Sequence, residues 1–235
     1  MNKKVIVSGA TKGIGRAIVL AMASDGCDVA FCARTAEDVQ KFEELLSDKY
    51  PDQHFLGVVT DVSIKSQIEA FGERVLNAFD HIDILVNNAG VFLPGALLGE
   101  DDGMLELQLN TNLISAYALT RVVAPHMVEQ KSGHIINICS VAGIQAYPNG
   151  GSYCISKFAL RGFSLILREE LKESGVKVTN VVPGATWSDS WKGTDLPDSR
   201  LMSPEDVAKA VLDLTNMSAS SVVEEIIIRP QLGDL

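Results

Sequence analysis

Tyr153 and Lys157 are two residues whose types and spacing could carry acid–base chemistry. They are four residues apart, so on a helix they lie one turn apart on the same face. A free tyrosine has a pKa of about 10, and an ammonium group one turn away favours the phenolate and lowers that pKa. Ser140 ends a strand-like segment ahead of a glycine-rich loop and could stabilise an oxygen that gains or loses charge. These residue types suit the reduction of a carbonyl or the oxidation of an alcohol. Taken alone, the tyrosine could equally be half-buried packing and the lysine a solvated helix face.

The size and charge of the chain exclude several other classes of protein. Its 235 residues are enough for one large α/β domain. With 30 acidic and 20 basic side chains the formal charge is -10, which disfavours nucleic acids and anionic membranes as partners because both need clustered cations. No apolar run approaches the length of a membrane span, and the short run near the amino terminus does not resemble a signal peptide, so we expect a cytoplasmic protein. The cysteines lack zinc or disulfide spacing, so we expect no metal site and four buried free thiols: Cys27, Cys32, Cys139 and Cys154.

Strand-like and helical segments alternate along the whole chain, a pattern typical of a doubly wound parallel sheet with helices on both faces. We see no repeat, low-complexity tract or linker, so residues 1–235 are predicted to form a single domain. The cofactor-binding part covers roughly residues 1–140, and the catalytic helix and substrate lid cover roughly residues 140–202. The predicted strands are residues 4–8, 29–32, 54–60, 84–87, 134–140, 176–182 and 223–228.

A glycine-rich loop directly follows the first predicted strand. Gly9, Gly13 and Gly15 are spaced Gly-x-x-x-Gly-x-Gly, with Lys12 and Ile14 between them. Glycines permit a tight turn and a close approach of the backbone, and the following helix offers free N–H groups to a pyrophosphate. The loop is predicted to bind phosphate, although an ordinary strand-to-helix connection could have the same composition.

The end of the second predicted strand indicates which dinucleotide would bind. Sites that prefer NAD usually place an acidic side chain here to hold the ribose 2′-hydroxyl. This chain has Ala33 and then Arg34, and Lys12 lies in the phosphate loop. Two cations favour a 2′-phosphate and therefore NADP(H), although Arg34 could be a solvated charge and Glu37 keeps NAD(H) open.

Polar residues also end the third and fourth predicted strands. Asp61, followed by Val62, could accept a hydrogen bond from an adenine amino group, or it could form a turn in which Ser63 caps the next helix. Ligands of such sheets bind beyond the carboxyl ends of the strands. The fourth strand places there the tetrapeptide Asn87-Asn88-Ala89-Gly90.

These features together resemble the classical short-chain dehydrogenases/reductases in order and spacing. The matching positions are Ser8, Gly9, Gly13, Gly15, Asn87, Asn88, Ala89, Gly90, Asn112, Ser140, Tyr153, Lys157, Pro183 and Gly184. The resemblance implies a seven-stranded Rossmann-type sheet, a nicotinamide cofactor and a catalytic tetrad of Asn112, Ser140, Tyr153 and Lys157. In this family the tyrosine is the acid/base and the serine orients the substrate oxygen. The lysine lowers the tyrosine pKa and holds the nicotinamide ribose, while the asparagine supports a water chain to the lysine. Asn112 is preferred over Asn110 because it precedes a long apolar helix, although both could be helix-turn amides.

The segment after Pro183 and Gly184 departs from the family pattern. A serine, Ser188, stands where a threonine is usual, so either Thr186 or Ser188 could contact the nicotinamide amide. The resemblance makes residues 185–202 the substrate lid. This lid contains Trp187 and Trp191, which could bind a planar or bulky apolar substrate or pack the lid onto the body.

The carboxyl-terminal residues favour one substrate class. Residues 222–235, with the stretch after Pro183, look like bacterial proteins of the sepiapterin-reductase group. In that group an acidic residue near the C-terminus can anchor a pterin, and Asp234 is the matching candidate, although it could be a solvated tail charge. We therefore expect an NADP(H)-dependent enzyme that reduces a ketone on a pterin side chain or a small diketone.

Besides a simple dehydrogenase of sugars or steroids, two alternatives remain open. The first is a 3-oxoacyl-(acyl carrier protein) reductase, for which Lys131 could dock the acidic carrier but the second expected cation falls near Ser174. The second is a non-catalytic NADP(H)-sensing protein, which the intact tetrad disfavours. Residues 107–127 and 158–171 resemble the helices that pair subunits in the family, so a homodimer or homotetramer is expected, although both helices must also cover the sheet.

Overall fold

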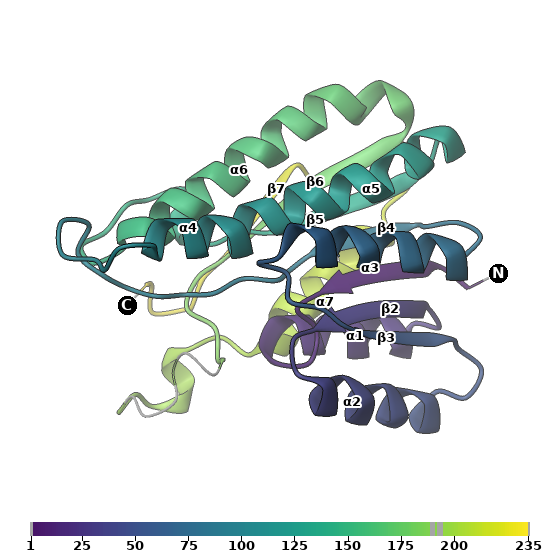
Figure 1. Cartoon of the computed structure of the whole chain (residues 1–235), viewed down its shortest axis with the longest axis horizontal. Helices are drawn as coiled ribbons and strands as arrows, with labels where there is room; N and C mark the ends of the chain where they lie inside the picture. The colour runs from purple at the N-terminus through teal and green to yellow at the C-terminus, as the bar shows by residue number, and fades with distance from the viewer. Residues whose placement is uncertain (1, 189–190, 192–194, 235) are drawn as a thin grey trace.

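The structure is a computed structural model that describes residues 2–188, 191 and 195–234. Within this part of the chain, seven parallel strands form one sheet in the order β3-β2-β1-β4-β5-β6-β7 (Figure 1). The strands are β1 (Lys4–Ser8), β2 (Asp28–Ala33), β3 (Phe55–Val59), β4 (Ile84–Asn87), β5 (Gly133–Ile138), β6 (Val176–Pro183) and β7 (Glu225–Ile228). The order reverses direction at β1, next to β4. The prediction of a single-domain, doubly wound Rossmann-type sheet is confirmed.

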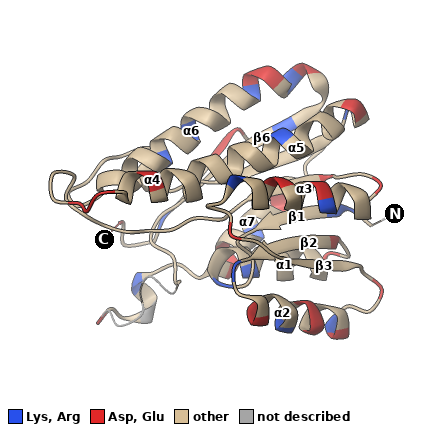
Figure 2. Ribbon diagram, in the orientation of Figure 1, with Lys and Arg blue, Asp and Glu red and all other residues tan. Residues whose placement is uncertain are grey.

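Helices cover both faces of the sheet because the central strands are apolar on both sides. Val5 and Val7 of β1 face the core beneath α1 (Gly13–Ser24), α2 (Ala36–Lys49) and α7 (Pro204–Thr215). Ile6 faces the opposite core beneath α3 (Lys65–Ala78), α5 (Ser115–Gln130) and α6 (Gly151–Leu171). Figure 1 shows β2 and β3 lying between α3 and α2. Basic residues (blue) and acidic residues (red) are interspersed along the ribbon of the outer helices (Figure 2).

The predicted strand at residues 134–140 is shorter in the structure. Strand β5 ends at Ile138, although the Cys139 amide still donates to the Val181 carbonyl at 2.7 Å. Ser140 then accepts a hydrogen bond of 3.1 Å from the Ala142 amide and begins the short helix η2 (Val141–Gly143). This turn releases the Ser140 side chain from the sheet at the carboxyl ends of the strands.

The apolar segment predicted at residues 107–127 is not one regular helix. It is divided into α4 (Met104–Leu109), a π-helical turn η1 (Asn110–Ile114) and α5. Such turns insert one residue into a helix and often occur at functional sites. In this chain the turn places the Asn112 side chain in the interior, whereas Asn110 stays exposed.

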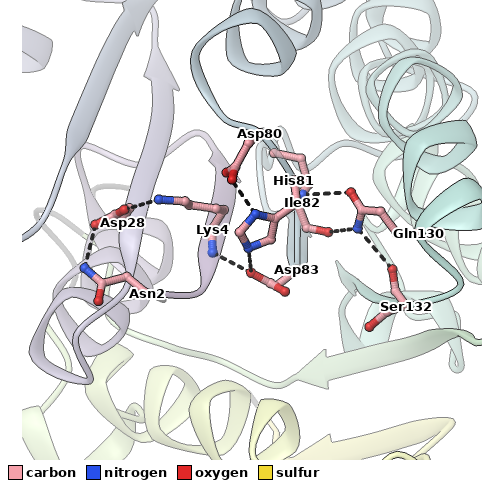
Figure 3. A network of polar contacts seen from close by, with 9 residues as sticks. All are labelled: Asn2, Lys4, Asp28, Asp80, His81, Ile82, Asp83, Gln130 and Ser132. Carbon is pink, nitrogen blue, oxygen red and sulfur yellow. Dashed lines mark hydrogen bonds and ion pairs between the residues drawn. The ribbon is translucent and has the colours of Figure 1, made fainter.

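A polar network ties together the amino ends of the strands, at the opposite edge from Ser140 (Figure 3). The Lys4 amide donates to Asp83 Oδ2 at 2.7 Å, and the Lys4 ammonium forms an ion pair with Asp28. His81 lies between two carboxylates, with its ring nitrogens 2.8 Å from Asp80 and 3.2 Å from Asp83. These contacts join β1 and β2 to the loop before β4.

All four cysteines are free and buried, as predicted. Among the described residues, no helix combines the length and apolar character that crossing a bilayer requires.

Candidate active site

Tyr153 and Lys157 lie on one face of α6, with the Lys157 ammonium 5.9 Å from the centre of the tyrosine ring. The lysine is buried and donates a hydrogen bond of 3.1 Å to the Ile138 carbonyl at the end of β5. The Tyr153 ring also meets Phe92 edge-on, with ring centres 4.8 Å apart. Helix α6 therefore holds both side chains beside the point at which β5 delivers Ser140.

The pKa of Tyr153 differs from the sequence prediction in its direction. Burial raises the pKa of Tyr153 above its ordinary value, and a hydrogen bond with the Ser140 side chain lowers it only in part. Burial also lowers the pKa of Lys157. The prediction that the ammonium makes this phenol acidic is wrong, because burial raises the pKa and the side chain that partly offsets burial is Ser140. Tyr153 is therefore protonated at neutral pH and suited to donate a proton.

Asn112 joins the loop after β4 to the catalytic helix. Its Oδ1 accepts from the Val91 amide at 2.7 Å, and its Nδ2 donates to the Val91 carbonyl at 3.0 Å and to Ser156 Oγ at 2.8 Å. A Cβ atom placed on Gly90 would lie 3.2 Å from Asn112 Oδ1 and 3.5 Å from Lys157 Nζ. The structure thus brings all four tetrad residues to the carboxyl edge of the sheet.

The glycine-rich loop has a shape that other residues would not tolerate. Gly9 has φ +67°, and a Cβ there would lie 2.7 Å from Ala89 Cα. Gly13 has φ +52°, and a Cβ there would make an ordinary contact of 3.7 Å with Ser188 Cβ. A Cβ on Gly15 would collide with the Gly9 carbonyl and the Asn88 amide. Among the described residues, no side chain caps the amino end of α1, which begins just after Lys12 and continues through Ile14. The loop and this helix end form a cradle that fits a pyrophosphate.

Asn88 and Ala89 hold this loop in place. Ser8 Oγ accepts hydrogen bonds of 3.1 Å from both of their amides, and the Asn88 side chain donates to the Ser8 and Gly9 carbonyls at 3.0 and 2.8 Å. The Asn88 side-chain amide therefore donates to the backbone of the glycine-rich loop and helps to fix its shape. The sequence predicts a ligand contact for Asn88, and no local pattern indicates this supporting contact with the loop.

The two cations expected near a cofactor ribose lie in different surroundings. Lys12 Nζ is 3.2 Å from Asp38 Oδ2 and is largely exposed. Arg34 is exposed directly after β2 and lies close enough to Asp61 to help lower the pKa of that carboxyl group, after hydrogen bonds from Ser63.

The sequence leaves two roles open for Asp61, which precedes Val62: a hydrogen bond from an adenine amino group, or a turn before the next helix. Asp61 Oδ1 accepts from the Ser63 amide at 3.0 Å and from its hydroxyl at 2.7 Å, which is the turn chemistry that the sequence left open. The proposed capping role of Ser63 is wrong, because α3 begins after Ile64 and no described side chain caps it.

The segment after β6 approaches the glycine-rich loop. Gly184 donates to the Ile228 carbonyl at 2.7 Å, and the buried Thr186 hydroxyl donates to the Gly184 carbonyl at 3.0 Å. Thr186 also pairs with Met202 in an isolated bridge. Ser188 lies over Gly13, since its Cβ would be 3.7 Å from a Cβ placed there. Pro183, Gly184 and Thr186 therefore lie at the sheet edge, with Ser188 above the phosphate cradle.

Only part of the predicted lid, residues 185–202, can be described, because residues 189–190 and 192–194 lie outside the described part. Trp187 is half-buried and donates its backbone amide to the Met202 carbonyl at 3.0 Å, and the Trp191 amide donates to the Ser188 carbonyl at 3.1 Å. In Figure 1 the short helix η5 (Asp198–Arg200) extends away from the sheet at the lower left. The tryptophans thus follow the site residues in the chain, and their contact with a substrate stays a prediction.

Asp234 lies in a tail that is tied to both the lid and the sheet. Its Oδ2 is 2.7 Å from Arg229 Nη1, and its backbone carbonyl accepts a hydrogen bond of 2.7 Å from Arg200. A Cβ on Gly184 would lie 3.0 Å from Asp234 Oδ1. The carboxylate is therefore next to the end of β6, but it already has a cation as partner.

The family model for short chain dehydrogenases matches residues 3–197, so the chain belongs to that family and is an oxidoreductase.

The similarity to individual relatives covers nearly the whole chain. Sepiapterin reductase of Chlorobaculum tepidum is 34% identical over 249 residues, covering 100% of this chain and 99% of that protein. A 3-oxoacyl-[acyl-carrier-protein] reductase of Haemophilus influenzae is 34% identical over 231 residues, covering 94% and 93%. The solved structure of a metagenomic short-chain oxidoreductase in complex with NADP superposes with a TM-score of 0.84 at 32% identity, with 97% of each chain covered.

Proposed function

We propose that this oxidoreductase reduces a ketone to an alcohol with NADPH and that Tyr153 is the proton donor. The observation that carries the proposal is the arrangement of the Tyr153 phenol, which is hydrogen-bonded to Ser140 and next to the buried Lys157 ammonium, at the carboxyl edge of the sheet. The phosphate cradle formed by the glycine-rich loop lies at the same edge.

The residues of this edge fit a dinucleotide. When bound, NADPH supplies the hydride that adds to the carbonyl carbon. Gly9, Gly13, Ile14 and Gly15 would hold the pyrophosphate with backbone N–H groups, and Lys12 and Arg34 would pair with a 2′-phosphate. The remaining cofactor contacts are assigned to Asp61, Val62, Asn88, Ala89, Gly90, Tyr153, Lys157, Pro183, Gly184 and Thr186.

The side chains of the tetrad account for the proton that the reduction requires. The Ser140 hydroxyl donates a hydrogen bond to the substrate carbonyl oxygen and so stabilises the charge that develops there. The Tyr153 hydroxyl gives its proton to that oxygen, which completes the alcohol and leaves a phenolate. The Lys157 ammonium stabilises this phenolate, and Asn112 holds the loop and helix that position both residues.

For the substrate we favour a ketone on the side chain of a pterin. The full-length relationship to a sepiapterin reductase supports this choice, as do the two lid tryptophans and the position of Asp234 beside Gly184. The acyl-carrier alternative is weaker because Lys131 precedes β5 and therefore lies at the edge of the sheet opposite to Ser140.

The proposal is tested by following NADPH consumption with a pterin side-chain ketone, an acetoacetyl thioester, a small diketone and a sugar ketone. We expect the highest kcat/KM with the pterin and a lower value when NADH replaces NADPH. Preference for the thioester would establish the acyl alternative. Tight NADPH binding without turnover of any ketone would contradict catalysis and favour a sensor.

We also propose that two subunits pair through α5 and α6, as a homodimer or within a homotetramer. Large apolar side chains on these helices are exposed in the single chain, among them Tyr117, Phe158 and Ile166. Phe158 also borders a pocket of about 700 Å³ with Leu97 and Tyr147. Light scattering tests this assembly. The four free thiols are compatible with the reducing cytoplasm, where we place the enzyme.

A further inference from the structure

A carboxylate from a distant loop caps the first turn of the catalytic helix. Glu100 lies between β4 and α4, and its Oε1 accepts a hydrogen bond of 2.9 Å from the Ser152 backbone amide. Its Oε2 accepts from the Ser152 hydroxyl. Ser152 is buried and immediately precedes Tyr153. The residue at the helix's own N-cap position, Gly150, contributes no side-chain bond, so Glu100 satisfies a helix-end donor from 52 residues away.

The backbone around Glu100 is shaped to receive this carboxylate. Gly151 has φ +33°, and a Cβ there would collide with Glu100 Oε1 and lie 2.6 Å from the Gly95 carbonyl. A Cβ on Gly95 would lie 2.8 Å from Glu100 Cγ. The Gly95 amide donates to the Asn149 carbonyl at 3.0 Å, so the two loops are joined by their backbones as well. Two glycines are thus required for the approach of one acid to α6.

The same loop reaches the tyrosine ring. Phe92, eight residues before Glu100, packs edge-on against Tyr153. The loop therefore holds Tyr153 twice, once through the ring contact and once through the helix turn that carries it. A negative charge at the amino end of a helix also stabilises that turn through the helix dipole.

We propose that Glu100 is a positioning residue that fixes the first turn of α6 and thereby the place of the Tyr153 hydroxyl relative to Ser140. This inference rests on the proposed role of Tyr153 as proton donor. A hydroxyl displaced by about 1 Å from its productive place can lower turnover about 100-fold while substrate and cofactor still bind. Glu100 should accordingly affect kcat more than binding.

The test compares Glu100→Ala with Glu100→Gln and with Asp102→Asn, an exposed carboxylate two residues further along the same loop. We expect E100A to lower kcat about 10- to 100-fold with the pterin ketone, with the NADPH dissociation constant changed less than about threefold. Glutamine keeps an oxygen that accepts from the Ser152 amide, so E100Q should recover most of kcat. D102N should match the parent enzyme.

A second readout does not depend on activity. Amide hydrogen exchange of the first turn of α6 should accelerate in E100A, stay near the parent rate in E100Q and be unchanged in D102N. Parent-like kcat and exchange in E100A would overturn the proposal, as would a parallel collapse of cofactor affinity and folding in both E100A and E100Q. If Tyr153→Phe keeps full activity the proposed function fails, whereas the exchange result still reports whether Glu100 holds this turn.

Discussion

The Asn112 side chain donates a hydrogen bond of 2.8 Å to Ser156 Oγ, across 44 residues of sequence. Ser156 lies between Tyr153 and Lys157 on α6, and Asn112 lies on the π-helical turn η1. Because Asn112 also binds the backbone amide and carbonyl of Val91, one side chain joins three segments of the site.

Replacing Asn112 by alanine should therefore destabilise the fold as well as impair turnover. The change leaves the amide and carbonyl of Val91 without their side-chain partner and removes the donor to Ser156 Oγ, which keeps its own hydrogen bond to the Tyr153 carbonyl. We expect the free energy of unfolding to fall by about 2 kcal/mol. Urea denaturation measures this change. Asn110→Ala is the matched control because Asn110 is exposed on the same turn, and its effect should stay within about 0.5 kcal/mol. Equal effects of the two variants would show that Asn112 does not join the segments in solution.

Gly9→Ala should weaken NADPH binding and stability together. A left-handed φ costs an alanine about 1 kcal/mol or more, and its Cβ would press on Ala89. Gly162→Ala is the opposite case, because Gly162 lies inside α6 with no heavy atom within 4 Å of the added Cβ. That change should stabilise the protein by about 0.5 to 1 kcal/mol. Thermal unfolding and NADPH titration measure both variants, and an unchanged NADPH affinity in G9A would contradict the phosphate cradle.

Asp234→Asn tests the substrate class. If the carboxylate beside Gly184 binds the aminopyrimidine edge of a pterin, its loss should raise KM for the pterin ketone about tenfold, the effect of one charged hydrogen bond. KM for a small diketone should change little. Arg229→Met is the companion variant, since it frees the carboxylate from its ion pair without removing it. An unchanged KM for the pterin in D234N would remove Asp234 from the substrate site.

His134 should make stability depend on pH. Burial lowers its pKa to about 4 from an ordinary value of 6.5, and its Nε2 lies 2.8 Å from Thr179 Oγ1. Thr179 donates its own proton to the Val223 carbonyl, so neutral His134 carries its proton on Nε2. Between these two pKa values the unfolded chain binds more protons than the folded one, so stability is lost as pH falls from about 6.5 towards 4.

The size of this effect can be measured against a control. The shift corresponds to at most about 3 kcal/mol of unfolding free energy, which is fully present above the unfolded pKa and lost below the folded one. His134→Gln should flatten the pH dependence of urea denaturation in this window, whereas a change at the exposed His126 should not. A parent-like slope in H134Q would place the titrating group elsewhere.

The sequence alone predicted the order of strands and helices because the alternation of apolar segments is local. It also predicted the neighbourhood of Tyr153 and Lys157, since helical spacing determines which side chains share a face. The glycine loop was predictable because Gly9 and Gly13 need left-handed backbone conformations.

Other features depend on contacts between residues that are distant in the sequence, so no local sequence pattern indicates them. The π-helical turn that buries Asn112, the cap from Glu100 to Ser152 and the tie from Arg200 to the tail are of this kind. The pKa of Tyr153 was mispredicted for a related reason. Helical spacing indicates the nearby ammonium of Lys157, whereas the burial that raises the pKa of Tyr153 emerges only from the packed fold.

The most direct test of the account is the turnover of Tyr153→Phe with NADPH and a pterin ketone, alongside Tyr50→Phe at the remote end of α2 as control. Removing the hydroxyl removes the proton donor and leaves the phosphate cradle intact. We predict that kcat falls about 100- to 10,000-fold in Y153F, while the NADPH dissociation constant stays close to that of the parent. Turnover in Y153F equal to that of Y50F would contradict Tyr153 as the acid.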